Sequence, residues 1–176
     1  MDAGAAAVTG AAIGAIGGLS GGWLAALEQR HQRRADGRRW RNETRRDAYV
    51  AYIAPTKQLA AAQWKLVDCL WAEGRTTDDW QAGFVVAHDA WTEFSTAADA
   101  VAVAGPGSAV EAADALRTAM SDIQRAVMAW LAAAREAGHG RLAEFDARFK
   151  AAAEAKRQPD QKFQAAARTA LNTESP

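Results

Sequence analysis

The chain has 176 residues, with 21 basic and 21 acidic side chains, so its formal net charge is zero. This length allows one membrane segment and one small soluble domain. The balanced charge argues against a protein whose whole surface binds nucleic acid. The single cysteine, Cys69, excludes an internal disulfide framework and fits a reducing compartment. Abundant alanine and rare proline favour an all-α fold.

The first predicted element is a transmembrane helix over residues 3–27. No charged side chain occurs in this segment, which is long enough to cross a bilayer once as a helix. A cleaved signal peptide is disfavoured because no Lys or Arg precedes the apolar run and several arginines follow it. A flexible Gly/Ala tail is the alternative, since glycine and alanine contribute little to insertion.

Glycines recur every fourth residue within this segment, at Gly10, Gly14, Gly18 and Gly22. On a helix they form one stripe without side chains, where another transmembrane helix can pack closely. We therefore predict a helix-association face and a possible homo-oligomer. Composition bias toward glycine and alanine is the simpler explanation of the same pattern.

Residues 28–54 are predicted to form a basic connector helix. Arginines spaced by three or four residues share one face of such a helix; they are Arg30, Arg34, Arg38, Arg41 and Arg45. We expect this face to contact the membrane surface or a protein partner. The positive-inside rule then places the N-terminus outside and the C-terminal domain in the cytoplasm of a cell membrane. Nucleic acid is disfavoured as the partner because no second basic patch follows.

This N-terminal third resembles a group of uncharacterised proteins from actinomycetes, Streptomyces above all. The resemblance is carried by the Gly/Ala-rich segment, the pair Trp40-Arg41 and the run Arg45-Arg46-Asp47-Ala48-Tyr49, followed by a helical domain. It implies a cellular setting and no mechanism.

Residues 56–157 are predicted to form a cytoplasmic bundle, so that the whole chain contains a transmembrane helix and an antiparallel bundle of about four helices. Pro55 is expected to kink or break the helix that precedes it. Two stretches repeat apolar residues in alternating steps of four and three, as packed bundle helices do. The first seam is Trp80, Phe84, Ala87, Trp91, Phe94, Ala98 and Val101, and the second is Ala109, Ala113, Leu116, Met120, Ile123, Val127, Trp130 and Ala134.

Helix ends and the C-terminus complete the prediction. Thr77 is expected to cap the helix that starts near 78, and Ser108 with Glu111 is expected to form a capping box for the next. Gly74 and Gly138 are placed at helix ends. Residues 158–176 are predicted to be a polar, frayed tail.

No residue pattern indicates catalysis, a metal or a cofactor. His31, His88 and His139 lie far apart in the sequence, and His88 is expected to be half-buried beside the first seam. Cys69 has no histidine next to it and is expected to serve packing.

Our leading hypothesis is therefore a single-pass, membrane-anchored helical protein that acts by protein association and is not an enzyme. The first alternative is a membrane effector whose glycine-striped helices oligomerise and permeabilise the bilayer. The second alternative is a soluble helical protein whose arginine face contacts nucleic acid.

Overall fold

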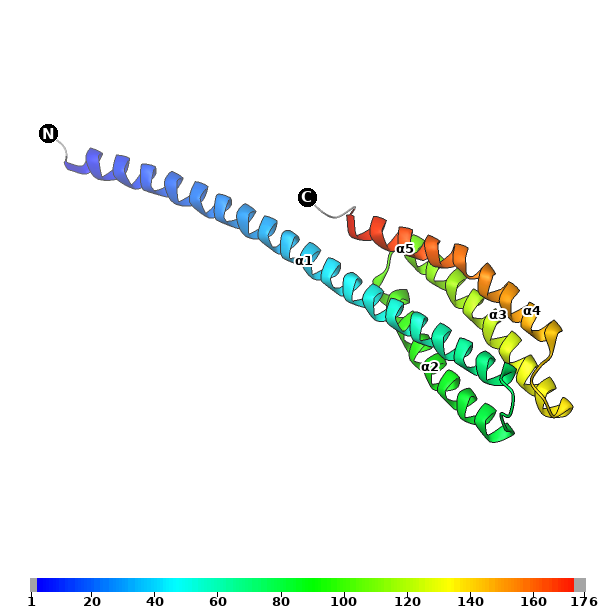
Figure 1. The fold of residues 1–176 in the computed structure, drawn as a ribbon. Helices are drawn as coiled ribbons and strands as arrows, with labels where there is room; N and C mark the ends of the chain where they lie inside the picture. The colour runs from blue at the N-terminus through cyan, green and yellow to red at the C-terminus, as the bar shows by residue number, and fades with distance from the viewer. Residues whose placement is uncertain (1–2, 173–176) are drawn as a thin grey trace. The chain divides into compact units, whose positions relative to one another are not determined.

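The computed structural model describes residues 3–172, and it describes side chains for residues 29, 32, 33 and 36–172. Every element within this range is a helix (Figure 1). The elements are α1 (Ala3–Trp71), α2 (Thr77–Ala104), α3 (Gly107–Ala137), α4 (Ala143–Ala155) and α5 (Arg157–Asn172). The all-α prediction is confirmed. The described residues divide into two compact units, one up to Arg41 and one from Asn42 onward.

The second unit is a bundle in which α4 and α5 together take the place of a fourth helix. Both pack along α3, and α2 packs on α3 as well. Lys156, between α4 and α5, keeps helical dihedral angles, and its N–H bonds to Ala152 O at 3.2 Å. Pro159 has no N–H to offer Ala155, which accounts for the interruption. The prediction of about four helices joined by short loops is confirmed.

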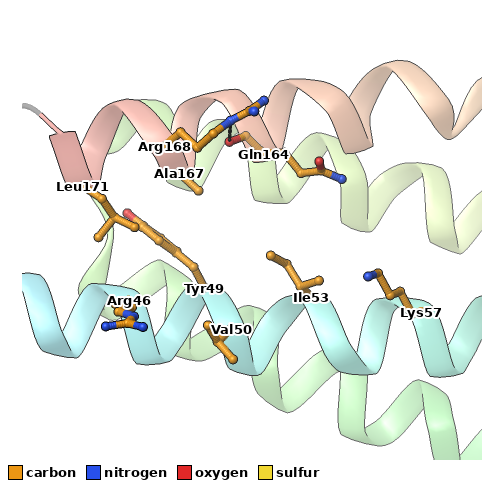
Figure 2. Close-up of a pocket in the computed structure, with 9 residues that line it drawn as sticks. All are labelled: Arg46, Tyr49, Val50, Ile53, Lys57, Gln164, Ala167, Arg168 and Leu171. Atoms are coloured by element: carbon orange, nitrogen blue, oxygen red, sulfur yellow. Dashed lines mark hydrogen bonds between the residues drawn. The ribbon is translucent and has the colours of Figure 1, made fainter.

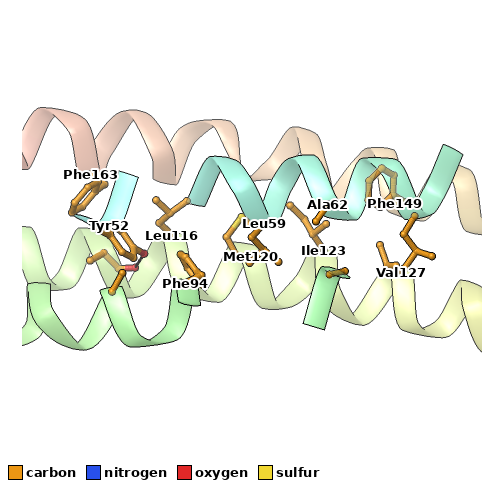
Figure 3. Close-up of a cluster of buried hydrophobic side chains, with 14 of the residues drawn as sticks. Tyr52, Leu59, Ala62, Phe94, Leu116, Met120, Ile123, Val127, Phe149 and Phe163 are labelled. Carbon is orange, nitrogen blue, oxygen red and sulfur yellow. Dashed lines mark hydrogen bonds between the residues drawn. The ribbon is translucent and has the colours of Figure 1, made fainter. Parts of the chain in front are cut away.

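The bundle core follows the two predicted seams (Figure 3). Every residue of the α3 seam is buried, from Ala109 to Ala134. On α2 the seam is buried at Trp80, Ala87, Phe94 and Val101, and its other members are half-buried. The wider α3 face also buries Ala119 and Leu131, so α3 is the central helix of the core.

Aromatic rings join α1 to the rest of the core. Tyr52 stacks on Phe94 of α2, with ring centroids 5.3 Å apart, and meets Phe163 of α5 edge-on at 4.8 Å. Trp64 meets Phe149 of α4 edge-on at 4.7 Å. Tyr52 and the three phenylalanines are fully buried, and burial of each of these rings contributes roughly 2–3 kcal/mol, whereas Trp64 stays 42% exposed. The stretch of α1 around Tyr52 therefore packs against α5, and the stretch around Trp64 packs against α4.

The sequence left open whether the helix continues through Pro55, and in the structure it does not break there. Residues on both sides of Pro55 are helical within α1. Proline removes only the N–H that Ala51 O would accept, and Ala51 is exposed, so water can replace that bond. Thr56, one residue later, is buried, and its hydroxyl donates to Tyr52 O at 2.7 Å.

The expected polar tail is wrong over residues 158–172, which belong to α5. This helix buries Phe163, Ala167 and Ala170 against the bundle. Pro159 lies in the first turn of α5, where the fixed φ of proline suits the start of a helix. Because of Pro159 and the polar composition, the sequence did not indicate that this segment is an amphipathic helix.

Two predicted caps differ from the structure. Thr76, not Thr77, caps α2, and its hydroxyl accepts from Asp79 N at 3.3 Å while Asp79 Oδ2 accepts from Thr76 N at 2.9 Å. The first residue of α3 is Gly107 after Pro106, with no side-chain cap, so the Ser108–Glu111 box does not form. Gly138 ends α3 with φ +70°, as expected.

The predicted connector 28–54 is divided between the two units, because Ala48, Tyr49 and Tyr52 are buried in the bundle. Among residues with described side chains, no helix is long and apolar enough to cross a membrane. The predicted transmembrane segment 3–27 lies outside those residues.

Candidate interaction surfaces

The predicted glycine stripe and part of the arginine face lie outside the residues whose surroundings are described. These are Gly10, Gly14, Gly18, Gly22, Arg30 and Arg34. Arg38 and Arg41 are exposed in the first unit. Arg45 belongs to the bundle and is half-buried, and its Nε donates to Ala104 O, at the end of α2, at 3.1 Å. This bond satisfies a carbonyl that the helix itself leaves free.

The candidate reactive side chains are dispersed. His88 is exposed and packs beside Phe84, with ring centroids 5.8 Å apart, so the expectation of a half-buried histidine is wrong. Cys69 is half-buried, and burial raises the pKa of its thiol, which disfavours the reactive thiolate. No group of three metal-ligating side chains comes together within the described part of the chain.

A groove between α1 and α5 is the candidate site with the most unpaired charge at its rim (Figure 2). Its volume is about 410 Å³, within the range of small ligand sites. Apolar side chains line it from both helices: Val50 and Ile53 from α1, Ala167 and Leu171 from α5. Val50 leaves 61% of its surface exposed, although it lies on the same helix as the buried core residues.

The rim of this groove is cationic. Arg46 and Lys57 come from α1 and Arg168 from α5, and none of the described residues that line the groove is acidic. None of these three cations forms an ion pair with a carboxylate of the described residues. Arg168 Nε bonds only to the carbonyl of Gln164, at 3.2 Å. The groove thus combines apolar surface with positive charge that is not neutralised by a neighbouring carboxylate.

Tyr49 adds an unused hydrogen-bonding group to the groove. Its side chain is 2% exposed, and its hydroxyl has no hydrogen-bond partner. Burial raises the pKa of this phenol, while the nearby Arg45 charge partly opposes the shift. The hydroxyl is buried, so it becomes a donor for a carboxylate or carbonyl in the groove only when the Tyr49 side chain turns outward.

A second hollow, of about 520 Å³, lies beside Trp64 and Trp71 at the C-terminal end of α1. Four charged side chains line it, and all but Asp68 form ion pairs within the bundle. Lys150 pairs with Asp146 at 2.8 Å, and Arg141 pairs with Glu73 at 2.6 Å and donates to Trp71 O at 3.1 Å. This hollow therefore offers a ligand less unpaired charge than the α1–α5 groove does.

The groove could not be predicted from the sequence, because the residues of its α5 wall lie in the segment 158–176, which was expected to be a tail. The signal on α1 was present: Arg46, Val50, Ile53 and Lys57 follow steps of four, three and four, as one helix face does. No family model, curated protein or solved structure matches this chain. The resemblance to the actinomycete proteins stays a prediction.

Proposed function

We propose that this chain is a single-pass membrane protein whose cytoplasmic helical bundle acts by associating with other proteins. The observation that carries the proposal is the uncharged segment 3–27 followed directly by the arginine-rich stretch from Arg30. An apolar run of this length suits a bilayer, and a cluster of arginines suits its cytoplasmic surface.

The bundle supports the association part of the proposal. Apolar side chains from all five helices form its core. The cationic groove between α1 and α5 lies on its surface. An apolar groove with a charged rim is a usual way for a helical protein to receive a partner.

The glycine stripe supports self-association within the membrane. Gly10, Gly14, Gly18 and Gly22 give a second copy of the segment a close approach. Replacing Gly14 and Gly18 by leucine should lower the oligomeric state in detergent. An unchanged state would remove the stripe from the proposal.

The anchor is tested by an alkaline carbonate wash of membranes that contain the full chain or a variant lacking residues 2–27. Carbonate removes peripheral proteins and leaves spanning proteins in the membrane. We expect the full chain to stay in the pellet and the truncated chain to be soluble and helical by circular dichroism. Release of the full chain would overturn the anchor.

A further inference from the structure

The α1–α5 groove has a counterpart on the surface of the same bundle. Helix α2 contains Asp78, Asp79, Asp89, Glu93 and Asp99 and no lysine or arginine. Its outward side also exposes apolar surface, with Val85 at 46% and Val103 at 90% exposure. An acidic helix with exposed valines is the chemical complement of an apolar groove with a cationic rim.

The two surfaces also share the same spacing. The groove wall on α1 reads Arg46, Val50, Ile53, Lys57, with a cation at each end and two apolar residues between. The outward stripe on α2 reads Asp78, Ala82, Val85, Asp89, with an acid at each end and two apolar residues between, all exposed. Both run in steps of four, three and four, so the charges of each pair lie about 16 Å apart along the helix.

These charges are available for a partner. Arg46 and Lys57 have no ion pair among the described residues, and neither do Asp78 and Asp89.

We infer that the groove binds a second copy of this chain through the α2 stripe Asp78–Asp89. The apolar pairs of the two helices pack as neighbouring helices of a coiled coil do, and the terminal charges pair across the contact. The contact joins two different surfaces, so each copy can offer its stripe to one neighbour and its groove to another. The inference rests on the proposed protein association and identifies the partner as a second copy of the chain. It does not depend on the membrane segment.

The test is a charge-reversal exchange in nonionic detergent, read by sedimentation velocity, on the full chain with Gly14→Leu and Gly18→Leu in every sample, so that the glycine stripe does not contribute. The groove variant carries Arg46→Glu and Lys57→Glu, and the stripe variant carries Asp78→Lys and Asp89→Lys. Each variant alone should self-associate at least about tenfold more weakly than the unmodified chain, because like charges meet at both ends of the contact. A mixture of the two should associate again, because each groove then meets a stripe of opposite charge.

Matched controls reverse exposed charges outside both surfaces. Lys65→Glu with Lys162→Glu matches the groove variant in charge change, and Glu111→Lys with Glu136→Lys matches the stripe variant. Both controls should associate as the unmodified chain does. Thermal unfolding followed by circular dichroism should show the same helical fold in every variant, since all the changed residues are exposed.

A crosslink separates this contact from association through the glycine stripe. Chains carrying Val50→Cys and chains carrying Val85→Cys, both with Cys69→Ala, are mixed under mild oxidation. We expect a disulfide-linked heterodimer, and much less of it when Met128→Cys replaces Val85→Cys. Equal crosslinking of both pairs, or no recovery of association on mixing, would overturn the inference.

An anionic lipid is the other ligand whose charge would suit the groove. A bundle that does not self-associate, but binds phosphatidylglycerol vesicles less when Arg46 and Lys57 are reversed, would assign the groove to lipid and overturn the proposed contact. The carbonate wash is independent of these measurements, so loss of the groove contact and loss of the anchor can be told apart.

Discussion

At the scale of single residues, the two tyrosines of α1 differ in one hydrogen bond. The Tyr52 hydroxyl donates to Ala113 O at 3.0 Å, whereas the buried Tyr49 hydroxyl has no partner. Tyr52→Phe should lower the free energy of unfolding by about 1 kcal/mol. Tyr49→Phe should leave it unchanged or raise it, because no bond is lost and a buried polar atom is removed. Urea unfolding of the two variants gives the comparison.

The same tyrosines make stability depend on alkaline pH. Burial raises the pKa of Tyr49 and of Tyr52 in the folded chain above the ordinary value of 10.0. The folded state then holds phenolic protons that the unfolded state releases, so the free energy of unfolding falls as pH rises above about 10. The chain has no other tyrosine. The double variant Tyr49→Phe with Tyr52→Phe should lose stability less steeply between pH 9 and pH 11.

Gly140 is required by a close backbone contact. A Cβ at this position would collide with the carbonyl oxygen of Leu70, which belongs to the α1 backbone. Gly140 O also accepts from Trp130 Nε1 at 2.7 Å, so the loop cannot move away without losing a buried bond. Gly140→Ala should lower the free energy of unfolding by about 2 kcal/mol or more. Gly107→Ala, where a Cβ meets nothing, should leave it unchanged or raise it.

At the scale of single elements, the start of α2 depends on one hydroxyl. Thr76 and Asp79 exchange the hydrogen bonds of a capping box. Thr76→Ala should lower the free energy of unfolding by about 1 kcal/mol, because Asp79 N then loses its acceptor. Thr77→Ala, one residue into the helix, should have little effect. Equal losses in both variants would contradict the assignment of Thr76 as the cap.

The helices and their buried faces could be predicted where the apolar period was regular. The α3 seam, from Ala109 to Trp130 and Ala134, was predicted residue by residue, since its alternating steps match the geometry of bundle packing. Helix ends were less predictable. Thr76 and Thr77 are both acceptable caps, and only the dihedral angles of the folded chain distinguish them.

The candidate site was less predictable because it joins elements distant in sequence. The α1 wall of the groove shows a helix period, but the α5 wall depended on Phe163, Ala167 and Ala170 being buried. Pro159 and the polar residues around it favoured a tail on local grounds. Tertiary packing outweighed that local preference, as it often does for short amphipathic helices.

At the scale of the whole molecule, we propose that the two parts of the chain lie in different environments. The bundle from residue 42 holds its own core of α1 to α5 side chains. The segment 3–27 has no charged residue, and we propose that lipid stabilises it. Lipid should therefore stabilise the helix over residues 3–27 and leave the stability of the bundle unchanged.

Amide hydrogen exchange of the full chain, with and without liposomes, measures both parts in one experiment. Peptides from the buried stretches of α1 and α3 should be protected in both conditions, because their helices close the bundle core. Peptides from residues 3–27 should exchange at least about a hundredfold more slowly when liposomes are present. An amide exchanges only when its hydrogen bond breaks in contact with water, and the bilayer core contains no water. Rapid exchange of residues 3–27 in the presence of liposomes, with the bundle still protected, would contradict the membrane anchor.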